Sequence, residues 1–296
     1  MNRKQLQNIV DAVANHADDS AYIARVITET IQNNPDIKPG WALNLTKLLT
    51  LCTGKPIKSV PFSVFTDGNS KEPFLSFSGM PGRAFCPGAG DCAVWCYSFS
   101  SWRYPAAFCR QIQNTMLLST DAGRLFILDE LDAQLRRAKY RALDRVDFRL
   151  YVDGDFRSVD DIGFWMNTIE NRPKLAAYGY SKSFHELLGF DVATRYSGDA
   201  WPSNYVLNVS SGHKHSAEVV AAVEALPITR GHFVAVPMAK TARHADHGNR
   251  DHQKALRETY GRKAFTCPGE CGDCTPSGHA CGSERFRGVD IIIAAH

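Results

Sequence analysis

From about residue 60 onward, short apolar segments alternate with segments whose apolar residues recur at helical spacing. Chains that alternate in this way form parallel sheets, because each crossover returns the chain to the same end of the sheet. The pattern therefore predicts an α/β fold, and both an open doubly wound sheet and an incomplete (β/α)6 barrel fit it. The predicted strands cover residues 73–79, 147–154, 174–181, 205–211, 232–238 and 289–296.

The N-terminal part of the chain lacks this alternation and has a helical pattern instead. Leu6, Ile9 and Val13 share one helical face, and Pro and Gly residues interrupt the pattern further on. We therefore expect an N-terminal helical extension over residues 1–58, which caps an α/β body over residues 59–296.

Seven of the nine cysteines fall into two tight groups, each in a loop rich in Gly and Pro. Such loops are typical of soft metal centres, either tetrahedral zinc or iron–sulfur clusters. Four thiolates can complete the ligand shell of a metal, whereas three leave one position open. The odd cysteine count and the spacing of CGDC weigh against disulfides. The first group is Cys86, Cys92 and Cys96, and the second is Cys267, Cys271, Cys274 and Cys281.

Several ligand arrangements fit these cysteines. For the first group we favour a [4Fe–4S] cluster, with zinc plus a distant fourth ligand, or simply buried cysteines, as alternatives. For the second group zinc and iron–sulfur fit comparably well, and both groups could share one cluster. His279 could join as a ligand, although an exposed loop histidine is the simpler interpretation. Cys109 is interpreted as a core residue.

Polar residues follow the predicted strands at their carboxyl ends, where ligands bind in both sheet architectures. Asp153 and Asp155 follow the second predicted strand, Ser181 and Lys182 the third, and Lys240 the fifth. A single polar residue at such a place is usually a helix cap, but the repetition indicates one shared site. Lys182 could hold a carboxylate or phosphate there, or only cap the strand end.

Charge and hydropathy narrow the class of protein. A formal net charge of +3, without a long Lys/Arg run, argues against nucleic-acid binding. A zinc-stabilised nucleic-acid-binding protein stays open as an alternative, with basic residues in the stretch 136–141. No apolar stretch reaches the roughly 18 residues of a membrane span, and the N-terminus does not resemble a signal peptide. We therefore expect a cytoplasmic protein with reduced thiols and no membrane contact.

Four motifs carry a resemblance to a known family: CPGAGDCAVWCYS, FRLYVDGDFRS, AAYGYSKS and CPGECGDC, in this order. Together they resemble the phage "gene product 88" proteins over roughly residues 60–281. Those proteins are in turn similar to radical S-adenosylmethionine (SAM) enzymes. The resemblance implies a partial (β/α)6 TIM-like barrel, with a [4Fe–4S] cluster on Cys86, Cys92 and Cys96 and SAM bound at its open iron.

The resemblance also implies a set of cofactor-binding residues. Asp153, Gly154 and Asp155 occupy the place of a Gly-rich motif that helps bind the SAM amino group, and Ser181 and Lys182 correspond to polar residues of the same site. The sequence departs from the superfamily pattern in two ways. The first loop is C-x5-C-x3-C in place of C-x3-C-x2-C, and VDGDF has one glycine where two are common.

These features lead to three functional hypotheses. The first is an enzyme that cleaves SAM reductively and acts on an unknown substrate. The second is a non-catalytic iron–sulfur redox sensor, or a factor that binds a host protein, in the host cytoplasm if the chain is phage-encoded. The third is the zinc-stabilised binding protein.

Overall fold

A computed structural model describes residues 1, 3–52, 56–70, 72–197, 200–238, 249–272, 274–275 and 278–294. Within these ranges no helix is both long and apolar enough to cross a membrane. Lys240, which was predicted to lie at the end of a strand, falls outside the described residues.

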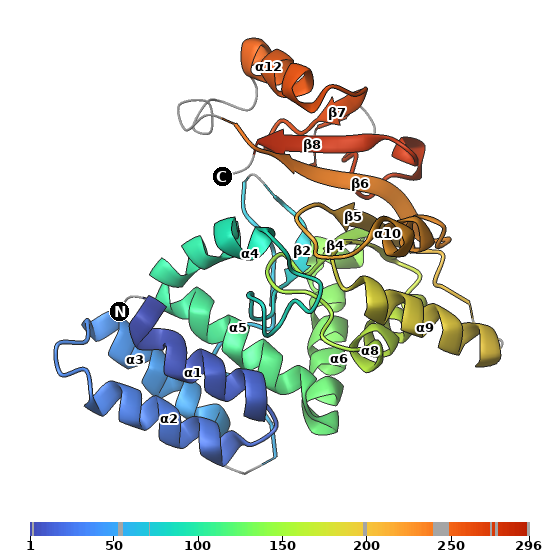
Figure 1. Cartoon of the computed structure of the whole chain (residues 1–296). Helices are drawn as coiled ribbons and strands as arrows, with labels where there is room; N and C mark the ends of the chain where they lie inside the picture. Colours follow the sequence, from blue (N-terminus) through green and yellow to red (C-terminus); the bar gives the residue numbers. More distant parts are fainter. Residues whose placement is uncertain are drawn as a thin grey trace.

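The predicted N-terminal helices are present as α1 (Arg3–His16), α2 (Ser20–Gln32) and α3 (Pro39–Leu48), followed by the short 3-10 helix η1 (Leu49–Cys52). Asp19 caps α2, because its carboxylate accepts a hydrogen bond from the Tyr22 backbone N–H at 2.9 Å. Figure 1 shows these helices beside α5 (Pro105–Leu118), with which they share one buried apolar core. The proposed domain boundary at residue 58 stays a prediction.

Eight strands form one mixed sheet in the order β1-β2-β3-β4-β5-β6-β8-β7. Only β1 pairs in antiparallel orientation, and every other neighbouring pair is parallel. The prediction of an α/β fold with a mostly parallel sheet is therefore confirmed. The strands are β1 (Phe65–Thr66), β2 (Leu75–Phe77), β3 (Val146–Leu150), β4 (Leu175–Ser181), β5 (Tyr205–Ser210), β6 (Thr229–Val236), β7 (Ala264–Thr266) and β8 (Asp290–Ala294).

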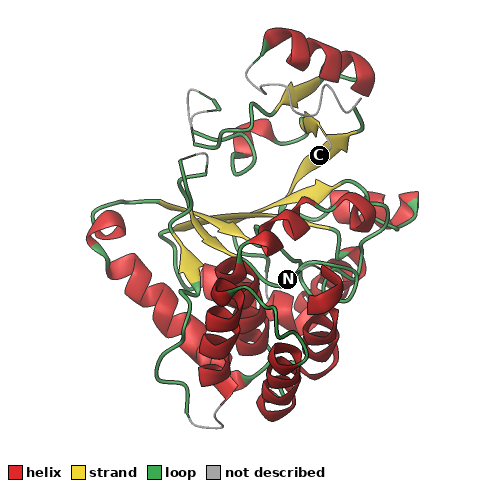
Figure 2. Cartoon of the chain, turned by 90° about the vertical axis from the view of Figure 1, so that its left-hand side faces the viewer, coloured by secondary structure: helices red, strands yellow, loops and turns green. Residues whose placement is uncertain are grey.

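The strands β2 to β6 lie side by side in chain order, without the reversal at which a doubly wound sheet changes direction. The long helices that connect them pack their apolar faces on the same side of the sheet (Figure 2). That side holds the main core, in which Trp165 contacts the Phe77 and Phe148 rings. The helices after α5 are α6 (Asp121–Arg136), α7 (Ala138–Arg141), α8 (Val159–Glu170), α9 (Phe184–Ser197), α10 (Ala217–Glu224) and α12 (Arg250–Tyr260).

The opposite face of the sheet is covered by the segment that carries the four C-terminal cysteines. Ala280 and Cys281 are buried there against Tyr178 and Val206, whose side chains point away from the helices. The segment ends in a short 3-10 helix, η3 (Glu284–Phe286), before the chain enters β8. This packing brings the C-terminal cysteines to the same sheet that positions the first cysteine group.

Candidate metal centre

The two cysteine groups, which are far apart in the sequence, face one cavity of about 420 Å³. The cavity lies at the carboxyl ends of β3, β4 and β5 and extends along β6 and β8, and all seven cysteines of the two groups line it. By contrast, Cys109 is buried in the core beneath α1–α3, and Cys52 packs against that same core. The interpretation of Cys109 as a core residue is therefore confirmed.

The first cysteine loop is anchored on the loop that follows β5. The backbone N–H groups of Gly90 and Cys92 both donate to the Gly212 carbonyl, at 3.0 and 3.2 Å, and Lys214 N–H donates to the Gly88 carbonyl at 3.1 Å. A Cβ on Gly88 would lie 1.5 Å from the Lys182 carbonyl oxygen. Glycine at position 88 thus lets the cysteine loop approach the end of β4 closely.

Replacing Gly88 by alanine is expected to push this loop off the end of β4. The added methyl group would overlap the Lys182 backbone, and overpacking of this kind costs about 1–3 kcal/mol of unfolding free energy. Gly40→Ala is the matched control, because a Cβ there meets nothing within 4 Å and Ala is the better helix former. Urea unfolding of both variants measures the difference, and equal stability of the two would contradict the account.

No disulfide joins any of the nine cysteines. Burial raises the pKa of the Cys86 and Cys92 thiols, and it raises the pKa of Cys267 to about 11 and of Cys271 and Cys281 to about 12. Thiols with such pKa values are protonated at neutral pH unless a metal displaces the proton. Across the described residues, no three His, Cys, Asp or Glu side chains converge closely enough to hold a metal ion. The ligand roles of the seven cysteines therefore stay predictions.

The backbone around the C-terminal cysteines provides N–H donors to sulfur. Gly269 N–H points to Cys267 Sγ at 3.4 Å, and Ala280 N–H points to Cys274 Sγ at 3.3 Å. The Cys281 carbonyl accepts from Asn208 Nδ2 at 3.0 Å, which ties the segment to the middle of β5. Such N–H···S contacts stabilise thiolate sulfur in metal centres.

Unpartnered polar atoms surround the same cysteines. Arg149 Nε, Tyr178 Oη and Glu72 Oε1 are all buried, and none has a hydrogen-bond partner among the described residues. All three residues are close enough to Cys271 to interact with it electrostatically. Buried polar atoms are rarely left unpaired, so a group that interacts with them is expected here. Together with the four thiols, these atoms supply the chemical groups that a charged, thiolate-ligated metal centre would use, although the thiols do not converge on one point.

The five predicted cofactor-binding residues have different surroundings. Asp155 is buried and accepts hydrogen bonds from Ser181 Oγ and from the backbone N–H of Lys182 and Phe156, all within 2.8 Å. It therefore joins the ends of β3 and β4, and burial raises its pKa in spite of these bonds. Asp153 accepts from Gln111 Nε2 at 2.9 Å and does not line the cavity.

Gly154, Asp155 and Lys182 line the cavity, whereas Ser181 is buried beneath it. Gly154 has a positive φ of 87°, which suits glycine, and it packs against the backbone of residues 79–80. Lys182 Nζ donates to Ser210 Oγ at 2.7 Å, so one of its three N–H groups is used by the protein. Lys182 thus brings a positive charge into the cavity beside the first cysteine group.

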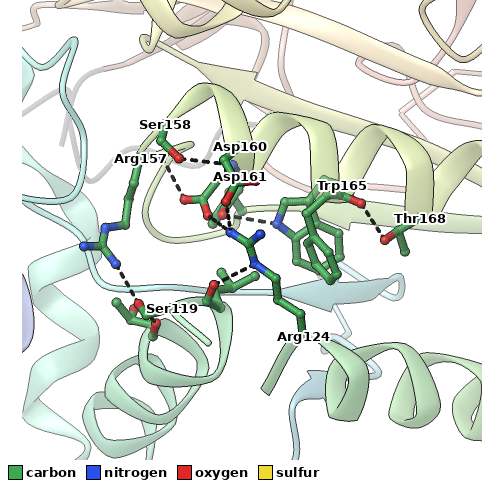
Figure 3. Close-up of polar contacts among 12 residues, drawn as sticks. Ser119, Arg124, Arg157, Ser158, Asp160, Asp161, Trp165 and Thr168 are labelled. Atoms are coloured by element: carbon green, nitrogen blue, oxygen red, sulfur yellow. Dashed lines mark hydrogen bonds and ion pairs between the residues drawn. The ribbon is translucent and has the colours of Figure 1, made fainter. Parts of the chain in front are cut away.

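The chain segment between β3 and α8 is held by the polar network drawn in Figure 3. Ser158 caps α8 by accepting from Asp161 N–H at 3.1 Å, and Arg124 forms an ion pair with Asp161 at 3.2 Å. Arg157 donates to Ser119 Oγ at 3.2 Å, which links this segment to the end of α5. The network fixes the backbone on which Gly154 and Asp155 reach the cavity.

The sequence did not point to Glu72 or Arg149, although both line the cavity. The sequence could have identified Arg149. It lies between the apolar residues Phe148 and Leu150 in a buried strand, so its side chain must face the opposite side of the sheet from theirs. The expectation of an exposed His279 was wrong. Its ring is only 6% exposed, lies against Phe74 and Tyr178, and accepts from Gly282 N–H at 3.1 Å.

Fold and site together define a mixed α/β protein with a cysteine-lined cavity at the strand ends. The chain belongs to the gene product 88 family, because a model of that family matches residues 57–289. The resemblance to this family is thereby confirmed. No curated protein and no solved structure matches the chain.

Proposed function

We propose that this protein is an iron–sulfur protein with two cysteine-ligated centres around one ligand cavity. Cys86, Cys92 and Cys96 would hold a [4Fe–4S] cluster whose fourth iron has no protein ligand. The four C-terminal cysteines would hold a second centre, either iron–sulfur or zinc. The observation that carries the proposal is that all seven grouped cysteines line one cavity, while the two isolated cysteines do not.

An open iron supplies one-electron chemistry and a binding position for a small chelating molecule. The residues around the cavity provide the complementary contacts. Lys182 offers an ammonium group that would bind a carboxylate, and Gly154 allows close approach to the backbone. Trp95 and Phe233 contribute apolar surface that limits access of water to the cluster.

The chain order of β2 to β6 and the helices on one side of the sheet support a partial (β/α)6 barrel, as in radical SAM enzymes. We therefore propose SAM as the molecule at the open iron, with reductive SAM cleavage on an unknown substrate as the reaction. Lys182 would orient the SAM carboxylate. Asp155 would support the site indirectly, since its oxygens already bind Ser181 and the backbone.

One observation favours a second, non-catalytic function. The Asp153 carboxylate binds Gln111 and does not face the cavity, and the Asp155 carboxylate already accepts hydrogen bonds from the protein backbone. The motif implied to bind the SAM amino group therefore has its carboxylate oxygens already engaged by the protein. In this alternative the clusters serve as a redox sensor, or they stabilise a surface that binds a host protein, with zinc at the second centre as a further variant.

The two functions differ in their response to SAM. The enzyme is expected to change the electron paramagnetic resonance (EPR) spectrum of the reduced cluster when SAM is added. Lys182→Met should weaken SAM binding about 10- to 100-fold, because a charge-assisted hydrogen bond is lost. Lys174→Met is the matched control at the opposite end of β4, where the lysine donates a solvent-exposed hydrogen bond to the Arg141 carbonyl. An intact cluster whose EPR spectrum does not change when SAM is added would support the non-catalytic alternative.

A further inference from the structure

A largely buried ion pair lines the cavity that both cysteine groups face. Arg149 Nη1 is 2.7 Å from Glu72 Oε2, and the side chains are only 14% and 15% exposed. The guanidinium also reaches the Tyr97 hydroxyl at 3.4 Å, one residue after Cys96, and lies 5.0 Å from the centre of the Tyr180 ring. Arg149 therefore lies next to the residue that follows Cys96, and it lines the same cavity as both cysteine groups.

Each partner of this pair keeps one buried polar atom unpaired. Arg149 Nε and Glu72 Oε1 have no hydrogen-bond partner in the described part of the chain, and the hydroxyl of Tyr178 beside them has none either. A buried ion pair is costly to desolvate, so it is seldom retained for stability alone. Both residues line the cavity together with the four C-terminal cysteines and interact electrostatically with Cys271, which indicates a role toward the charge of the four-cysteine group.

We propose that Arg149 and Glu72 set the electrostatic potential at the centre held by Cys267, Cys271, Cys274 and Cys281. A thiolate-ligated centre carries net negative charge, which the guanidinium stabilises and the carboxylate destabilises. The effect is strong because the pair is shielded from water. This inference rests on the proposed function, since it requires a metal at these cysteines.

The two residues must therefore act with opposite sign. Arg149→Gln should make the centre harder to reduce, and Glu72→Gln should make it easier to reduce. Each should change the ratio of reduced to oxidised centre by about tenfold, which corresponds to about 59 mV for a one-electron couple. Arg149→Lys keeps the charge and should stay near wild type. If the ion pair only supports the fold, both variants should change the ratio of reduced to oxidised centre in the same direction.

The test is a redox titration of the full-length protein after its iron, sulfide and zinc have been measured. The signal of the four-cysteine centre is the one that Cys271→Ser abolishes. Arg195→Gln is the control, because its ion pair with Asp191 lies on α9 outside the cavity and its side chain is 76% exposed. If the centre holds zinc, the readout is the rate at which a chelator removes it, which should be faster in Arg149→Gln and slower in Glu72→Gln.

The possible results distinguish the role of the ion pair from the presence of the metal centre itself. Opposite shifts in Arg149→Gln and Glu72→Gln, with Arg149→Lys and Arg195→Gln unchanged, would establish the inference. Wild-type protein that carries no metal at these cysteines would refute the proposed function itself. Metal present, with both variants shifted the same way or not at all, would overturn the role of the ion pair and leave the metal centre in place.

Discussion

Serine in place of Cys86, Cys92 or Cys96 is expected to abolish the [4Fe–4S] cluster that we propose for the first centre. With only two thiolates left in the loop, the cluster would lose one of its three protein ligands, and the fourth iron cannot compensate for that loss. The expected result is the loss of about four irons and about four sulfides per chain. Metal analysis and the EPR spectrum of the reduced protein measure it.

Cys109→Ala is the matched control for these variants. Cys109 is fully buried in the core beneath α1–α3, so its loss should cost stability, about 1 kcal/mol, but no iron. Equal iron loss in Cys109→Ala and Cys92→Ser would show that the decrease reflects misfolding. Full iron content in Cys86→Ser, Cys92→Ser and Cys96→Ser would refute the proposal that these three cysteines hold a cluster.

The second large effect is expected at Arg230, which holds the C-terminal segment on the sheet. Its guanidinium is buried and donates to Asn208 Oδ1 at 2.7 Å and to the carbonyls of Phe286 and Val289 at 2.9 and 2.6 Å. Arg230→Met would leave these acceptors unpaired, and a loss of about 3–5 kcal/mol in unfolding free energy is expected. Asn208 also binds the Cys281 carbonyl, so metal at the four-cysteine centre should be released more readily.

Arg285→Met serves as the control for Arg230, because this exposed arginine lies in the same segment. Urea unfolding of the metal-loaded proteins, together with release of metal to a chelator, measures both effects. A stability change below about 1 kcal/mol in Arg230→Met would mean that the C-terminal segment does not depend on this contact.

The strands were predictable because each lies in a short segment rich in apolar residues and is followed by Gly or polar residues. All six predicted strands are present, though most are shorter at their ends than predicted. Two strands were missed, β1 and β7, because they span only two and three residues and their pairing depends on neighbours already in place. The order of the strands in the sheet could not be predicted, because it depends on which strands pair with each other.

The candidate site was predictable in its residue types but not in its arrangement. The spacing of the cysteines identified both groups, yet nothing local in the sequence reveals that the C-terminal segment packs on the sheet and lines one cavity with the first loop. That contact depends on Asn208 and Arg230, which look like ordinary strand residues in the sequence. Asp153 and Asp155 also look equivalent in VDGDF, but both lie beyond the end of β3, where the positive φ of Gly154 turns the chain and sends them to different partners.

The central claim is that the grouped cysteines bind iron and sulfide. The most direct test is to purify the wild-type protein without oxygen and to measure iron, acid-labile sulfide and zinc per chain. The account predicts at least about four irons with a matching amount of sulfide, because the three-cysteine loop would hold a [4Fe–4S] cluster. Zinc alone, without iron or sulfide, would contradict the first centre and the radical SAM-like function together.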